Sequence, residues 1–105
     1  MKPAMKTPTR FDNNPSSFKT FNYDEYTKEM LINYMESVEP NSAGGHVEDF
    51  VIGRIIDELE DVGYEDDSYY WSSQGIYHLK KYNLAVEPDF IEHVKKKMGA
   101  LYGKG

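Results

Sequence analysis

Four stretches of this chain carry apolar residues at intervals of three and four positions, which is the spacing along one face of an α-helix. They run from about 23 to 38, 46 to 62, 69 to 82 and 88 to 101, and short polar turns join them. Amphipathic helices of this length bury their apolar faces against one another. The pattern therefore predicts an all-α fold, a small bundle or orthogonal array of about four helices.

Residues that favour helix ends flank these stretches. Asn22, with Glu25 three positions later, forms a capping-box pattern before the first stretch. Gly63 and Asn83 suit the left-handed position that commonly follows a helix. Pro88 is favoured in the first turn of a helix, so it marks the beginning of the last stretch.

The third stretch has a second interpretation. Residues 68–71 are rich in aromatic side chains, which favour strands, so a strand there is an alternative to the helix. In the helical interpretation Trp71 shares a face with Leu79 and Tyr82. We therefore expect Trp71 to be buried and critical for stability.

The length of 105 residues fits one domain with one modest core. Residues 1–20 contain three prolines and several bases, so we expect a flexible basic arm that Phe11, Phe18 or Phe21 could pin in part. Residues 21–105 form the expected single helical domain. The chain has no cysteine, so this domain must be held by packing, without disulfides or thiolate-bound zinc.

Charge is distributed unevenly along the chain, whose formal net charge is −6. Residues 48–67 hold nine acids and a single base, Arg54, whereas lysines outnumber acids in residues 68–105. Dense negative charge repels nucleic-acid phosphates and attracts basic protein surfaces. We therefore expect the partner to be another protein with a basic surface, although a solvated face that keeps a small protein soluble would have the same composition.

If residues 46–62 are helical, several carboxylates of this segment share a solvent-exposed face. With the acids of the turn that follows, they would form an acidic helix edge able to imitate nucleic-acid phosphates. The expected edge consists of Asp49, Asp57, Glu60, Asp61, Glu65, Asp66 and Asp67.

Aromatic residues add two candidate contact points. Phe50 lies on the charged side of the second stretch, where it would either anchor an interface or fold under the preceding loop. Tyr70, Gln74 and Tyr77 would project from the third helix, and exposed tyrosines beside amides are typical of protein-binding surfaces.

No pattern in the sequence indicates catalysis. HExxH, P-loop and GxSxG motifs are absent, and the acids at 65–67 lack the alternating spacing of an EF-hand. His46, His78 and His93 show no metal-ligand spacing, so we expect them at the surface. The sequence therefore predicts no enzymatic activity, no cofactor and no metal site. No apolar run approaches the roughly 20 residues of a membrane span, and no secretory signal is recognisable, so a cytoplasmic location is expected.

These observations favour a small acidic protein-binding domain that acts as an inhibitor or adaptor. Mimicry of nucleic-acid phosphates by the acidic edge is the sharpest form of this hypothesis. The alternative is a DNA- or RNA-binding helical domain that uses the basic arm and the third helix, because the second and third stretches resemble a helix-turn-helix in outline.

Overall fold

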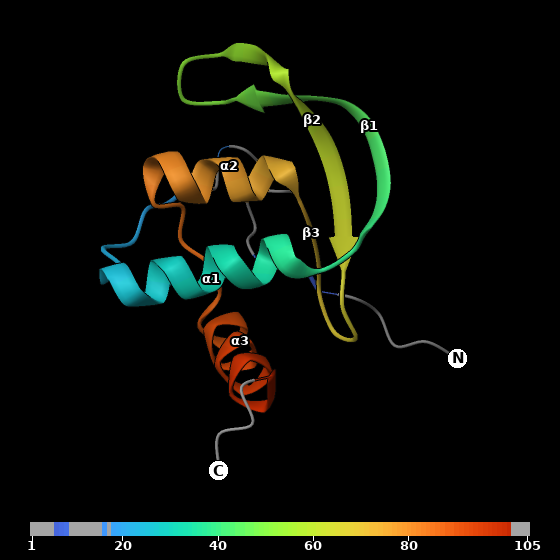
Figure 1. Cartoon of the computed structure of the whole chain (residues 1–105). Helices are drawn as coiled ribbons and strands as arrows, with labels where there is room; N and C mark the ends of the chain where they lie inside the picture. Colours follow the sequence, from blue (N-terminus) through green and yellow to red (C-terminus); the bar gives the residue numbers. More distant parts are fainter. Residues whose placement is uncertain (1–5, 9–15, 17, 102–105) are drawn as a thin grey trace.

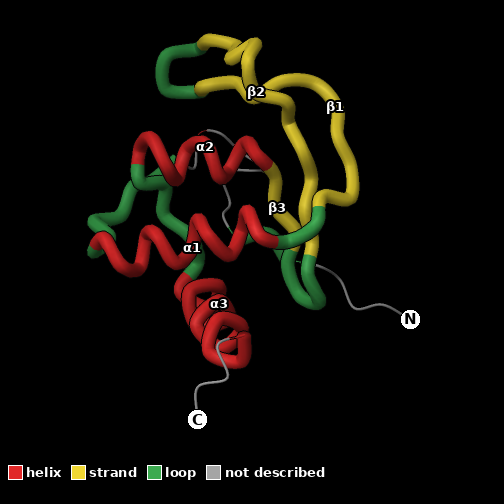
Figure 2. Tube along the Cα trace, in the orientation of Figure 1, coloured by secondary structure: helices red, strands yellow, loops and turns green. Residues whose placement is uncertain are grey.

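A long β-hairpin stands where the second helix was expected (Figure 1). The computed structural model describes residues 6–8, 16 and 18–101. Its elements follow the order α1 (Glu25–Ser37), β1 (Pro40–Asp49), β2 (Arg54–Glu65), β3 (Tyr70–Ser72), α2 (Ser73–Tyr82) and α3 (Pro88–Leu101). The three strands form one antiparallel sheet in the order β1-β2-β3 (Figure 2). This is an α+β fold, and the prediction of an all-α helical bundle was wrong.

The hairpin forms because its sequence favours strands and contains a specific turn. Residues 46–62 are rich in β-branched side chains, which are stiff and suit extended backbone: Val47, Val51, Ile52, Ile55, Ile56 and Val62. Between the strands, the Asp49 carboxylate accepts hydrogen bonds from the N–H groups of Val51 at 2.9 Å and Ile52 at 3.2 Å. Gly53 has a φ of +66°, and its N–H donates to the Asp49 carbonyl at 2.8 Å. The turn therefore reverses the chain in the middle of the expected helix.

Irregular pairing bends the hairpin. Val47 pairs with Ile56, but the next pair toward the base of the hairpin joins His46 to Glu60, so residues 57–59 are an insertion in β2. Insertions of this kind bend a strand pair and increase its twist. Figure 1 shows the hairpin arching so that its distal end lies beside α2.

Figure 2 shows the three helices and β3, and the core that they enclose includes Trp71 of β3. Trp71 is 2% exposed, and its indole N–H donates to the carbonyl of Met35 at 3.1 Å. Its ring contacts that of Phe90 in α3 at a centroid distance of 5.7 Å. The burial expected for Trp71 is confirmed, although this residue lies on a strand. Around it are buried Met30, Leu31, Tyr34, Met35, Tyr69, Ile76, Leu79, Leu84, Phe90 and Val94.

Several predicted helix ends are confirmed and others shift. α1 is capped by Asp24, whose carboxylate accepts from the N–H of Thr27 at 3.0 Å, and Asn22 lies before this cap. α2 begins after β3, so the alternative of a strand near residues 68–71 describes this region better than a continuous helix. Asn83 has the expected left-handed conformation after α2, with φ 60° and ψ 46°, and α3 begins at Pro88 as predicted.

The described residues of the expected flexible arm contact the domain. Lys6 forms a parallel bridge with Tyr69, and the carbonyl of the buried Pro8 accepts from the N–H of Glu87 at 2.7 Å. The ring of Phe18 packs edge-on against that of His78 at 6.0 Å. These described residues therefore contact the domain, and the flexibility expected for residues 1–20 stays a prediction; the expected role of Phe11 lies outside the described residues.

We predict that Trp71→Ala lowers the free energy of unfolding by about 3–5 kcal/mol, because the change removes a large buried ring and orphans the Met35 carbonyl. Urea unfolding followed by circular dichroism measures this. Tyr26→Ala, at an exposed position on α1, is the control. A loss below about 1 kcal/mol for Trp71→Ala would contradict the assigned core.

Candidate functional site

The distal half of the β1–β2 hairpin combines exposed aliphatic side chains with exposed carboxylates. The exposed fraction is 52% for Val51, 57% for Ile52, 56% for Ile55 and 40% for Leu59. Large aliphatic residues are usually buried, so four on one hairpin are a notable concentration. We use the name hairpin surface for the exposed aliphatic and acidic residues between positions 51 and 60, which are Val51, Ile52, Ile55, Asp57, Glu58, Leu59 and Glu60.

The expected acidic helix edge does not exist, and its members have different environments. Asp57 and Glu60 are exposed on β2, as expected for partner contacts. Asp61 is partly buried, and its carboxylate lies 3.3 Å from the backbone nitrogen of Gln74, which donates to it. Glu65 accepts from the side-chain amide of Asn41 at 3.0 Å.

Asp49, expected on a solvent-exposed face, is completely buried between the hairpin and α2. Besides the two turn N–H groups, its carboxylate accepts from the hydroxyls of Tyr77 at 2.7 Å and Tyr82 at 2.6 Å. Burial alone would raise the pKa of Asp49, but these four hydrogen bonds outweigh it and hold the pKa at about 2. Asp49 is therefore an ionised anchor that fixes the turn to α2.

His78 lies next to this anchor and is also completely buried, not at the surface as expected. Its Nδ1 lies 2.8 Å from the carbonyl of Gln74, and its Nε2 accepts from the N–H of Phe50 at 3.1 Å. These contacts require a neutral ring with its proton on Nδ1. Burial lowers the pKa of His78, although its Nδ1 contact with the Gln74 carbonyl and the nearby Asp49 charge oppose this effect.

Most of the aromatic and amide side chains that were expected to project outward make ring contacts or hydrogen bonds within the fold. Phe50 stacks on His78 with a centroid distance of 5.6 Å and remains 36% exposed. The Gln74 side chain accepts from the N–H of Glu48 at 3.0 Å and donates to the carbonyl of the same residue. Tyr77 bonds to Asp49, and only Tyr70, on β3, is strongly exposed. These residues do not form a single exposed stripe.

A second polar cluster lies at the other end of the sheet, where the β2–β3 loop meets α3. Asp66 Oδ2 accepts from the Tyr34 hydroxyl at 2.5 Å and lies 2.7 Å from Nε2 of His93. Asp66 Oδ1 accepts from the N–H groups of Ser68 and Tyr69, both at 2.8 Å. Burial raises the pKa of Asp66, but the hydrogen bonds to its ionised form lower the pKa overall.

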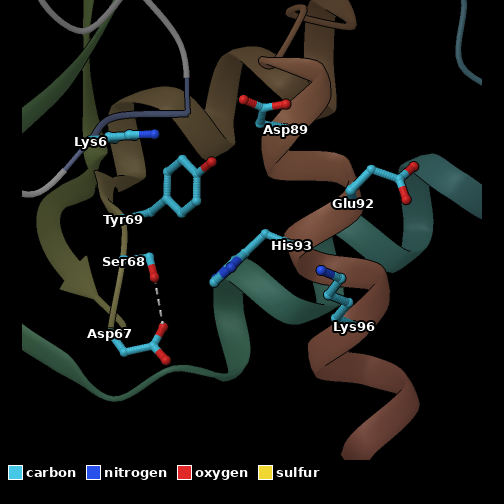
Figure 3. Close-up of a pocket in the computed structure, with 8 residues that line it drawn as sticks. All are labelled: Lys6, Asp67, Ser68, Tyr69, Asp89, Glu92, His93 and Lys96. Carbon is cyan, nitrogen blue, oxygen red and sulfur yellow. Dashed lines mark hydrogen bonds between the residues drawn. The ribbon is translucent and has the colours of Figure 1, made fainter.

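This cluster adjoins a pocket of about 480 Å³. Figure 3 shows His93 reaching from α3 toward the loop that carries Asp67 and Ser68, with Tyr69 beside it. Asp67 also accepts from the Lys97 ammonium group at 2.8 Å. The remaining residues around the pocket are charged and of both signs: Lys6, Asp89, Glu92 and Lys96.

Sequence reasoning missed the contribution of His93 to this cluster. Its distance in sequence from Asp66 hides the contact, which depends on how α3 packs on the loop. One local signal was present, because His93 follows the buried Phe90 by three positions and therefore shares its face of the helix.

Comparison with known protein families, curated proteins and solved structures gives no match. Within the described residues, none of the helices combines the length and the apolarity that crossing a membrane requires.

We predict that Asp49→Asn removes an acid-sensitive part of the stability. Because the pKa of Asp49 is about 2 in the fold and near 3.8 ordinarily, its charge stabilises the fold above about pH 4, and this contribution disappears as the pH falls toward 2. The shift corresponds to about 2 kcal/mol. Urea unfolding of both proteins at several pH values should therefore give a difference that shrinks in acid. A stability difference that does not change with pH would contradict the role of Asp49 as an ionised anchor. Asp57→Asn, at an exposed position, is the control.

Proposed function

We propose that this chain is a protein-binding domain, an adaptor or inhibitor, whose hairpin surface docks on a partner segment that carries basic and apolar side chains. The observation that carries the proposal is that exposed aliphatic residues and exposed carboxylates lie next to one another on one anchored hairpin. Aliphatic contacts would supply affinity through their burial, and the carboxylates would select a basic partner and speed its approach.

The buried anchor supports this proposal because it holds the turn in place before any partner arrives. Asp49 bonds the turn to two tyrosines of α2, and His78 bonds to the N–H of Phe50. A surface that is already ordered loses less conformational entropy on binding than a mobile loop. The hairpin surface can therefore be exposed and still be pre-organised.

The outer edge of β1 offers a second kind of contact. Among the described residues, β1 pairs with β2 on one side and with no strand on the other. The Gln74 side chain occupies this edge at Glu48, so an extended partner segment could pair with its backbone N–H and C=O groups only toward the base of the hairpin. An extended segment with alternating basic and apolar side chains would match both the edge and the hairpin surface.

Imitation of nucleic-acid phosphates cannot rest on a helix edge, because these acids lie on β1, on β2 and in the loop that follows β2. Nucleic-acid binding through the expected third helix also has less support than protein binding. In that alternative Gln74 and Tyr77 would contact the bases, but they are bonded to Glu48 and Asp49 of the hairpin.

The test is selection from a random peptide library followed by affinity measurements on the selected peptides. We predict that these peptides are enriched in lysine or arginine and in apolar residues. The double variant Asp57→Asn, Glu60→Gln should weaken their binding roughly 3- to 10-fold and reduce its dependence on salt. Ile55→Asp should weaken it at least about tenfold, because it places a charge in the apolar contact.

The matched control is Glu25→Gln with Glu29→Gln, which changes the net charge equally at exposed positions of α1. Equal binding by the hairpin and control variants would refute the proposal, as would selected peptides without basic residues. Random-sequence duplex DNA serves as a competitor. Stronger binding of DNA than of any peptide would favour the nucleic-acid alternative.

A further inference from the structure

We propose that Asp66, Asp67 and His93 bind a divalent transition-metal ion, and we take zinc as the test ion. One potential ligand atom from each of these residues lies within 4.8 Å of the other two. The set combines one imidazole with two carboxylates, and imidazole favours zinc and its neighbours over magnesium or calcium. This site lies away from the hairpin surface and does not depend on the proposed protein-binding function.

To bind an ion, Asp66 and His93 must separate slightly, and the exposed Asp67, whose ligand atom lies within 4.8 Å of theirs, must approach by up to roughly 1.5 Å. Tetrahedral ligands at about 2.0–2.2 Å from zinc lie roughly 3.3 Å from one another. His93 Nε2 and Asp66 Oδ2 are 2.7 Å apart with a proton between them, so an ion that replaces this proton requires the two atoms to move apart by about 0.6 Å. Three protein ligands leave a coordination position for water, which the adjoining pocket can supply.

Asp66 is already oriented by groups that would form the outer shell of the site. The N–H groups of Ser68 and Tyr69 hold Oδ1, which leaves Oδ2 directed at His93. The Tyr34 hydroxyl donates to the same Oδ2 and can continue to do so through the second lone pair. Such hydrogen bonds fix ligand orientation in metal sites.

One interaction competes with the ion. The Lys97 ammonium group lies 2.8 Å from Asp67 Oδ2 and would have to leave this oxygen or move to the other. Both side chains are substantially exposed, at 37% and 65%, so the pair is screened by water and contributes little stability. Its replacement by a divalent ion is therefore inexpensive, and Lys97→Gln should strengthen metal binding.

The experiment titrates zinc chloride and cobalt chloride into the full chain. We predict saturable binding of one ion and a visible cobalt absorption typical of low coordination number. Zinc at about 100 times its dissociation constant should raise the melting temperature by roughly 10 °C. In histidine nitrogen NMR spectra, the ring signals of His93 should shift, and those of His46 and His78 should not.

Three variants separate this site from adventitious binding. Asp67→Asn and His93→Asn should each weaken zinc binding at least about tenfold, whereas His46→Asn, at an exposed histidine of β1, should leave it unchanged. Asp67 is exposed, so its variant keeps the test informative if His93→Asn fails to fold. Equal zinc affinity in all variants, or no binding at millimolar zinc, would overturn the proposal.

Discussion

The placement of the hairpin depends on the buried carboxylate of Asp49. This residue ends β1, and its side chain accepts hydrogen bonds from the turn that follows and from two tyrosines of α2. A buried charge destabilises a fold unless hydrogen bonds compensate it, so the Asp49 carboxylate depends on these four donors. The donors, in turn, would lose their hydrogen-bond partner without the carboxylate. The same contact shapes the turn and joins the hairpin to the helical part of the fold.

This anchor explains why the hairpin can present aliphatic side chains to solvent without folding back on itself. Val47 and Asp49 face α2, whereas Ile55 pairs with Glu48 on the opposite face of the ladder. Because buried contacts fix the inner face, exposed residues on the outer face are accessible to a partner. Ile55 of the hairpin surface thus lies opposite the buried contacts, whereas Leu59 and Glu60 lie toward α2, where they line a pocket with Val47 and Tyr77.

The sequence predicted the parts of the fold that depend on local signals. Asn83 and Pro88 mark helix ends by their own backbone preferences, and Trp71 is buried because of its size. The hairpin prediction was wrong because paired aliphatic residues fit helical spacing as well as a strand, and the β-branched composition alone favours the strand.

The turn and the two polar clusters differ in how far they could be predicted. The combination of Asp49 with Gly53 four positions later was a visible local turn signal. The contacts between Asp66 and His93, and between Asp49 and Tyr82, join residues 27 and 33 positions apart. They follow from tertiary packing, and no local pattern specifies them.

Amide hydrogen exchange of the turn tests the role of the Asp49 anchor most directly. The N–H groups of Val51 and Ile52 donate to the carboxylate, and that of Gly53 donates to the Asp49 carbonyl. We predict that these three amides are protected nearly as strongly as those of buried α2 residues such as Leu79, although the side chains of Val51 and Ile52 are exposed. Exchange at the rate of an open loop, with α2 still protected, would contradict the account.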